Sequence, residues 1–289
     1  MLDLYIDNKN SLTALANALR ISISNSNNFN TPGFKYSFAS FTTTYKEAIT
    51  SGTKFNNPMH TGTGMTLGMT STSWEQGNLT IGTALDTAVV GEGLLILSSS
   101  ATQFGAGAPK VYTRSGRFLV DYNNEYVVDS HGRKVYGYKL DEAGNIISGE
   151  LVPIKTDGNT DIGFQDGGIL VSGYEANRAD PSVVTKPLYR LGLTTFQNKQ
   201  GLALTTGGAY KATVASGESL AHGAAGTAIG GSGGSTYGDL IAQKVEASNV
   251  DIAKVALDMN LLNRGFAAVQ AVIDDVTKII QNVMKIVGG

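Results

Sequence analysis

The chain has 289 residues, which is enough for one or two hydrophobic cores. Only 16% of the residues are charged and the formal net charge is −2, so electrostatics give no support for binding to nucleic acid or to an anionic membrane. The absence of cysteine excludes disulfides, thiolate nucleophiles and cysteine metal sites. No apolar run reaches the roughly 18 residues of a membrane-spanning helix, and the start MLDLYIDNK does not read as a cleavable signal peptide.

The N-terminal segment has the apolar spacing of a helix. Leu12, Leu15 and Leu19 recur at intervals of three and four residues, with good helix formers between them. Residues 24–30 are almost all Ser and Asn, whose side chains compete for backbone hydrogen bonds, so we expect the helix to end near here. Pro32 and Gly33 then predict a turn.

The middle of the chain, from about Asn56 to Gly238, is typical of an all-β region, with short alternating runs broken by turn residues. We predict strands at residues 110–113, 117–121, 126–129, 134–140, 154–156, 168–172, 189–196 and 209–214. The Gly/Ser-rich segment near residues 221–238 is predicted to be a flexible return linker.

The C-terminal segment carries an apolar heptad. Its members step alternately by four and three residues: Val255, Met259, Leu262, Phe266, Val269, Ile273, Val276, Ile280, Val283 and Val287. Such a narrow seam lies against another helix in coiled coils, so it needs a partner, either the other end of this chain or neighbouring copies. Ser248 and Asp251 have the spacing of an N-cap and its acidic N3 partner, and predict that the helix opens there.

The polar residues form no recognised catalytic or metal motif. The candidates are three histidines and three aspartates: His60, His131, His222, Asp157, Asp161 and Asp166. The histidines lie in separate segments without ligand spacing, and the aspartates do not have the spacing of an EF-hand loop. We interpret the aspartates as turn residues and expect no catalytic residue, no metal and no cofactor.

Four segments, in chain order, resemble the bacterial flagellar rod and hook proteins. They are the Asn-rich Thr-x-Gly-Phe-Lys signature in ISNSNNFNTPGFK, the Gln-Gly-x-Leu block in WEQGNLTIGTALDTAVVGEGLLIL, the hairpin YTRSGRF and the closing helix EASNVDIAKVALDMNLLNRGF. Each segment is moderately specific, and four in the right order are strong.

The resemblance implies a structural subunit of the flagellar basal-body rod that self-assembles into a helical tube for motility. It implies a mainly β central domain and N- and C-terminal α-helices that pair as a coiled coil. Residues 1–50 with 245–289 would form the assembly domain and residues 51–244 the central β-rich domain.

The resemblance further implies export by the flagellar machinery without a cleavable signal peptide. The basal body, spanning the periplasm, is then the expected location, with copies of the chain and other rod and hook proteins as partners. Three alternatives remain: the flagellar hook protein, a secreted β-rich trimeric adhesin, and a glycan-acting enzyme on a β scaffold.

The predicted assembly interface lies at both ends of the chain. Its N-terminal members are Leu12, Leu15, Leu19, Asn25, Asn28, Thr31, Gly33 and Phe34. Its C-terminal members are Ser248, Asn249, Asp251, Val255, Met259, Leu262, Arg264, Phe266, Val269, Ile273, Val276 and Ile280. In the hairpin, we expect Arg114 to pair with Asp121, either at a subunit contact or on the solvated surface.

Overall fold

The computed structural model describes residues 2–45, 54–57, 62–99, 110–121, 123, 125–229 and 236–287. The chain divides into two compact units. Unit 1 contains Met1–Phe29, Tyr36–Ser73 and Val250–Gly289, and unit 2 contains Asn30–Lys35 and Trp74–Asn249. Each unit therefore combines residues from the N-terminal and C-terminal parts of the sequence.

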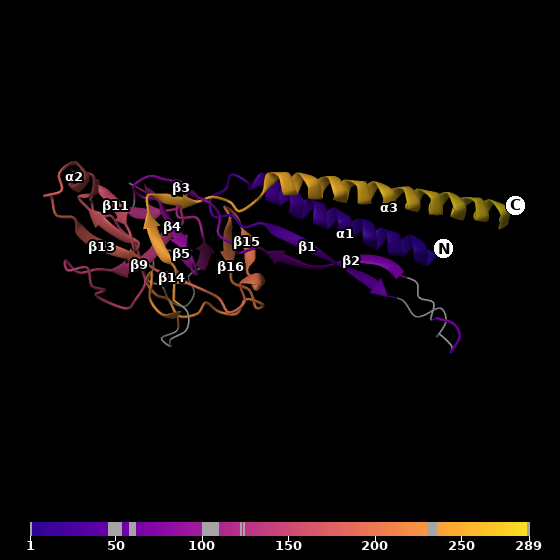
Figure 1. The fold of residues 1–289 in the computed structure, drawn as a ribbon, viewed down its shortest axis with the longest axis horizontal. Helices are drawn as coiled ribbons and strands as arrows, with labels where there is room; N and C mark the ends of the chain where they lie inside the picture. Colours follow the sequence, from indigo (N-terminus) through magenta and orange to yellow (C-terminus); the bar gives the residue numbers. More distant parts are fainter. Residues whose placement is uncertain are drawn as a thin grey trace. The chain divides into compact units, whose positions relative to one another are not determined.

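The described part of unit 1 is built from two helices and a β-hairpin. Its elements are α1 (Leu2–Asn27), β1 (Ser37–Tyr45), β2 (Gly62–Thr72) and α3 (Ile252–Val287). The helices lie side by side, and α1 begins at the end where α3 finishes, so they run antiparallel (Figure 1). β1 and β2 pair antiparallel, and β2 packs against α1. Since α1 contacts both α3 and the hairpin, Ala14, Leu15 and Ala18 are buried.

The ends of the two helices only partly follow the sequence prediction. α1 ends at Asn27, inside the Ser/Asn run as expected. α3 begins at Ile252, and Asp251 Oδ1 accepts hydrogen bonds from Ala253 N at 2.9 Å and Lys254 N at 3.3 Å, so Asp251 is the N-cap. The prediction of Ser248 as N-cap was wrong, because residues 247–251 are not helical and Ala247 N donates to Asn78 O within unit 2.

The β1–β2 hairpin was missing from the predicted strands. Ser37 pairs with Thr72 and Thr43 with Met65, with one register shift between these pairs and another after Thr43. The Ser- and Thr-rich sequence of β1 lacks a clear apolar alternation, so its strand conformation depends on the pairing with β2. The expected central β-rich domain begins at residue 51 and would therefore include β2. In the structure, β2 belongs to unit 1.

The described part of unit 2 is mostly β-structure, with short helical segments between the strands. Its strands are β3 (Leu79–Ile81), β4 (Thr87–Val90), β5 (Leu94–Ser98), β6 (Lys110–Thr113), β7 (Leu119–Asp121), β8 (Tyr126–Val128), β9 (Lys134–Lys139), β10 (Val152–Pro153), β11 (Ile162–Gln165), β12 (Ile169–Ser172), β13 (Lys186–Leu191), β14 (Leu193–Thr194), β15 (Ala203–Thr205), β16 (Ala209–Lys211), β17 (Asp239–Ala242) and β18 (Lys244–Glu246). The helices are α2 (Tyr174–Ala179) and η1 (Lys199–Gly201).

Most strands of unit 2 join one antiparallel sheet. Its main path through the described residues runs β11-β12-β13-β9-β5-β6-β16-β15, and β4 and β3 pair separately with β17 and β18. Strand β5 lies between two apolar clusters: Leu95 and Leu97 enter one, and Leu94 and Ile96 enter the other. Burial on both faces explains why β5 is an unbroken apolar run rather than an alternating one.

Most of the predicted strands of unit 2 are present, several with shorter ends, and residues 189–196 divide between β13 and β14. Residues 154–156 are an exception, because the strand there is β10, two residues earlier. The prediction lacked β3, β4, β5, β11, β15, β17 and β18. The predicted flexible linker near residues 221–238 also differs: among its described residues, Ala224, Ala225 and Tyr237 are buried. Small side chains and one large aromatic ring allow this segment to pack against the core. No helix in the described parts of the chain is long and apolar enough to cross a membrane.

A buried charge cluster as the candidate functional site

Glu246, the last residue of β18, is the centre of a buried charge cluster in unit 2. Its side chain is fully buried. Oε1 accepts hydrogen bonds from Lys35 Nζ at 2.6 Å and from Gly77 N at 2.9 Å, and Oε2 accepts from Arg114 Nε at 3.0 Å. We call Lys35, Arg114 and Glu246 the Glu246 cluster. Three donors satisfy a carboxylate that would otherwise be too costly to bury.

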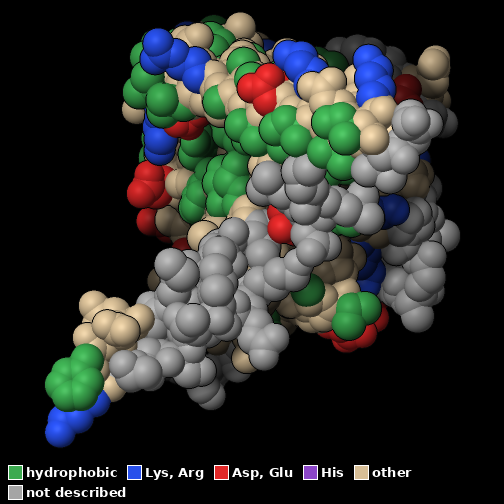
Figure 2. All heavy atoms as spheres, turned by 90° about the vertical axis from the view of Figure 1, so that its right-hand side faces the viewer, with side chains coloured by type: hydrophobic (Ala, Val, Ile, Leu, Met, Phe, Trp, Pro, Cys, Tyr) green, Lys and Arg blue, Asp and Glu red, His purple; other side chains and the backbone are tan. Residues whose placement is uncertain are grey.

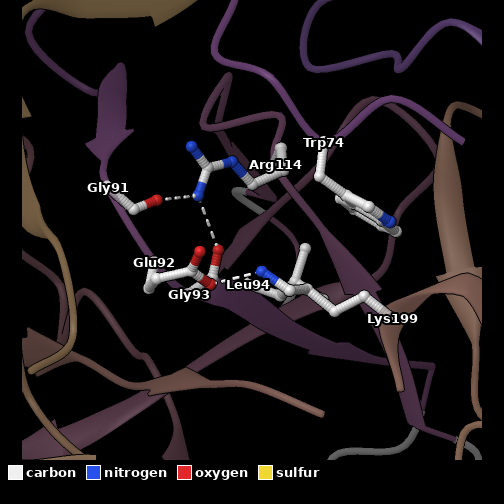
Figure 3. Close-up of a pocket in the computed structure, with 7 residues that line it drawn as sticks. All are labelled: Trp74, Gly91, Glu92, Gly93, Leu94, Arg114 and Lys199. Carbon is white, nitrogen blue, oxygen red and sulfur yellow. Dashed lines mark hydrogen bonds and ion pairs between the residues drawn. The ribbon is translucent and has the colours of Figure 1, made fainter. Parts of the chain in front are cut away.

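Arg114 donates hydrogen bonds to three backbone carbonyls as well as to Glu246. Nη1 donates to Gly91 O at 2.7 Å and to Gly93 O at 2.8 Å, and Nη2 donates to Val89 O at 3.0 Å. Figure 3 shows the guanidinium pointing at the loop that joins β4 to β5. A planar fork of fixed donors fits this arrangement, and a lysine could not replace it.

A small cavity of about 20 Å³ lies beside Arg114. Trp74 and Lys199 line it together with the β4–β5 loop, and Lys199 forms an ion pair with Glu92 (Figure 3). A space of this size accommodates about one water molecule, so it is too small for a substrate.

Lys35 connects the N-terminal segment to the cluster. Besides Glu246, its Nζ donates to Glu75 O at 2.6 Å, and its side chain is almost fully buried. Burial lowers the pKa of Lys35; Glu246 raises it without cancelling that effect, and Arg114 lowers it further. The cluster contains two cations and one anion, so Glu246 compensates both neighbours.

Glycines let the four resembling segments approach closely around this cluster. Gly33 has φ +70°, and a Cβ at this position would lie 2.3 Å from Ser115 N. A Cβ on Gly77 would lie 2.1 Å from Ala247 O. In both cases the atom in the way is backbone of another segment, so glycine is required by the fold. The four segments that resemble the rod and hook proteins are far apart in the sequence, and the structure brings them together around Glu246.

The predicted N-terminal interface residues lie in both units. In unit 1, Leu15 is buried, Leu12 and Leu19 are half-buried, and Asn25 Nδ2 donates to Ser37 O at 2.6 Å while Oδ1 accepts from Ser37 N at 3.0 Å. Asn28 Nδ2 donates to Ser24 O.

In unit 2, the turn predicted at residues 31–34 is present: Phe34 N donates to Thr31 O, and Gly33 N donates to Glu246 O at 2.8 Å. Phe34 is buried. These contacts attach the N-terminal segment to the last strand of unit 2.

The predicted C-terminal interface residues follow one face of α3. Val255 and Val276 are buried, whereas Arg264 and the seam residue Val283 are exposed. Six further seam residues are half-buried: Met259, Leu262, Phe266, Val269, Ile273 and Ile280. Asn249 lies in unit 2, where its Nδ2 donates to Glu75 O and its backbone N to Phe34 O. The Cβ position of Gly265 is 3.5 Å from Leu15, so the helices approach closely there.

A second apolar face of α3 was missed. Leu257, Leu261, Val272, Ile279 and Ile286 are 45–80% exposed, and we call them the outer stripe. Their separations of 4, 11, 7 and 7 residues correspond to about one, three, two and two helical turns, which is the signal that could have found them. Figure 2 faces the end of unit 1 where α3 finishes and shows hydrophobic side chains at the surface among charged ones.

The expected ion pair between Arg114 and Asp121 is not formed. Arg114 pairs with Glu246, more than a hundred residues away. The hairpin containing Asp121 is close in sequence, but the side chain of Arg114 is directed into the core of unit 2, where it is almost fully buried.

The polar residues considered as metal ligands have structural contacts. Asp161 accepts from Glu175 N and Ala176 N at the start of α2, and Asp166 accepts from Ala242 N. His131 lies in a turn and donates its backbone N–H to Asp129, whereas His60 lies outside the described residues. In the described part of the chain, no three His, Asp or Glu side chains are grouped as a metal site would require.

Comparison with known proteins agrees with the motifs. No family model matches the chain. The chain is 26% identical over 269 residues to the flagellar basal-body rod protein FlgG of Bacillus subtilis (strain 168), which covers 90% of this chain and 89% of that protein. Four motif segments in the family's order and similarity over nearly the whole length thus show that the protein is a relative of the bacterial flagellar rod and hook proteins.

Proposed function

We propose that this protein is a structural subunit of the flagellar basal-body rod, where it self-assembles with its own copies and with other rod and hook proteins into a helical tube. The relative is named as a flagellar basal-body rod protein, and the alignment covers nine-tenths of both chains. On this proposal, the protein has no enzymatic role and reaches the basal body through the flagellar export machinery without a cleavable signal.

The outer stripe of α3 is the observation that carries the assembly part of the proposal. α3 contacts α1, and α1 contacts the hairpin as well. The buried and half-buried residues of α3 include most of the seam. The outer stripe keeps five large apolar side chains in contact with solvent. Burying each would contribute roughly 1.5–3 kcal/mol, so a second α-helical surface covering the stripe would gain a large free energy at every repeated contact.

Within this proposal, α1 and α3 form the antiparallel coiled coil predicted from the heptad, and neighbouring copies cover the outer stripe. Both ends of the chain then contribute to one assembly domain. The Glu246 cluster belongs to the β unit and fixes the segments that lead into the helices.

The proposal can be tested by negative-stain electron microscopy of the full-length protein after concentration. Rods or tubes are expected for the wild type and for Asn260→Asp. Leu261→Asp should stay dispersed with an unchanged circular dichroism spectrum, because it places a charge on the outer stripe. Asn260 is a matched control, since it is exposed, adjacent in sequence and about a quarter of a turn away.

Other outcomes would point to the alternatives. Trimers of the wild type would favour an adhesin, and a stable monomer would contradict assembly. Immunogold labelling outside the cell, rather than at the basal body, would favour the hook. If Leu261→Asp formed tubes as well as the wild type does, the outer stripe would not be part of the assembly interface.

A further inference from the structure

We propose that residues 236–249 act as a strap that closes unit 2, and that Glu246 locks this strap in place. Closing the strap fixes β3, β4 and the N-terminal residues 30–35 together. The inference concerns the isolated chain and does not depend on the flagellar assignment.

The strap supplies the strand pairing of β3 and β4. β17 pairs antiparallel with β4, with Leu240 opposite Val89, and β18 pairs with β3, with Val245 opposite Thr80. In the described residues, β3 and β4 pair with no other strand. If the strap opens, both strands lose their ladder hydrogen bonds at once.

The strap also completes the hydrophobic core. Tyr237, Leu240 and Val245 are almost fully buried, and Leu240 belongs to the main apolar cluster of unit 2. A Cβ on Gly168 would lie 2.3 Å from Leu240 Cδ1, so this leucine fits tightly against the β11–β12 turn. These contacts hold the strap against the core of unit 2, but they do not involve the N-terminal residues 30–35.

Glu246 joins the strap to the N-terminal segment. When the strap opens, Lys35 and Arg114 lose the carboxylate that compensates them and remain as two neighbouring cations, which is strongly unfavourable in a buried site. Backbone bonds from Gly33 N to Glu246 O and from Asn249 N to Phe34 O break in the same step. The N-terminal segment and the strap are therefore expected to open as one cooperative segment.

The sequence separation makes the strap a late element of folding. Lys35 and Glu246 are 211 residues apart, whereas β5, β6 and β9 pair over much shorter distances. Contacts that close long loops form after local ones, because the loop-closure entropy must be overcome first. We expect the strap to be the least stable cooperative part of unit 2.

Hydrogen–deuterium exchange of the full-length protein, read by mass spectrometry, tests the inference. Glu246→Gln should raise exchange about tenfold or more in residues 30–35, 79–90 and 237–249, and leave β5 and β9 unchanged. Glu92→Gln is the control, because Glu92 lines the neighbouring cavity but pairs with Lys199 in a solvent-exposed position. It should change none of these segments.

Two results would contradict the proposal that Glu246 holds the strap in place. Equal acceleration in β5 and β9 would mean that Glu246 only contributes to global stability, and no acceleration would mean that it does not hold the strap.

A disulfide variant keeps the test decisive if Glu246→Gln does not fold. Ile81 and Lys244 are opposed in the β3–β18 ladder and exposed, and the chain has no cysteine of its own. Oxidised Ile81→Cys/Lys244→Cys should slow exchange in the distant residues 30–35 as well as locally. Slower exchange confined to β3 and β18 would contradict the cooperative strap.

Discussion

At the residue scale, Gly33 shows how one small residue permits a long-range contact. Its positive φ allows the turn after Pro32, and its missing side chain allows the backbone of Arg114 and Ser115 to approach. The sequence predicted the turn, but the second requirement appears only in the folded chain.

We expect Gly33→Ala to lower the free energy of unfolding more than Gly144→Ala does. Both glycines have positive φ, which costs an alanine roughly 1–2 kcal/mol, but nothing lies within 4 Å of the Cβ position at Gly144. At Gly33 the added Cβ also meets backbone. Chemical denaturation of both variants measures the difference, and equal losses would show that only the backbone angle matters.

Tyr36 in unit 1 predicts a pH dependence. Its hydroxyl donates to Asp258 Oδ2 at 3.0 Å, and burial, together with this bond, raises its pKa to about 12 from 10.0. A raised pKa favours the protonated phenol in the folded state, so its contribution is complete below pH 10.0 and is lost as the pH rises through about 12.

The stability difference between the wild type and Tyr36→Phe should therefore be constant below pH 10.0 and shrink toward pH 12. Other buried tyrosines cancel in this comparison. The test is denaturant titration of both proteins across this range, and a difference that grows with pH would contradict the assignment. Tyrosinate absorbance of the two proteins gives an independent reading.

At the element scale, unit 1 depends on how closely β2 approaches α1. Ser11 Oγ donates to Asp7 O at 3.0 Å and accepts from Met65 N at 3.1 Å, so one hydroxyl connects the helix to the strand. Gly64 brings the backbone of β2 to this point, since a Cβ there would lie 2.5 Å from Ser11 Oγ.

Ser11→Ala should destabilise unit 1 by about 1–3 kcal/mol, because Met65 N–H loses its acceptor. Thr13→Ala is the control: Thr13 makes the same kind of bond to Lys9 O, but it is exposed on α1. Alanine is a good helix former at both positions, so the comparison isolates the bond to β2. Exchange of the Met65 amide measures it, and unchanged protection in Ser11→Ala would contradict the prediction.

The two faces of α3 illustrate the limit of a pattern within one element. The heptad predicted which side chains would lie toward a partner helix, and Val255 and Val276 are indeed the most buried residues of α3. The periodicity alone did not distinguish the face used within unit 1 from the outer stripe. That distinction depends on the neighbour that each face meets.

At the scale of the whole molecule, both units are built from sequence-distant segments. The chain enters unit 2 briefly at residues 30–35 and returns to unit 1 before most of unit 2 is made. This interleaving gives each unit contacts that span much of the chain, such as Tyr36 with Asp258 in unit 1 and Lys35 with Glu246 in unit 2.

A structural role predicts that none of the six His and Asp residues considered as catalytic or metal candidates is essential on its own. We expect alanine at His60, His131, His222, Asp157, Asp161 or Asp166 to leave assembly and swimming intact in a strain lacking the native copy. An enzyme would contain a position whose loss costs about 100- to 10,000-fold in rate without disturbing the fold. One variant that assembles normally but does not restore swimming would contradict the structural role.

The sequence by itself determined the features that depend on near neighbours in the chain: the helices at both ends, the end of α1 in the Ser/Asn run, and about half of the strands of unit 2, among them β6–β9, β12 and β16. Local periodicity and turn chemistry are sufficient for these. Only the tertiary structure decided the β1–β2 hairpin, the packing of residues 221–229 and the partner of Arg114. Each of these depends on a group brought close by folding, and burial of Glu246 between two cations becomes favourable only when all three segments are present.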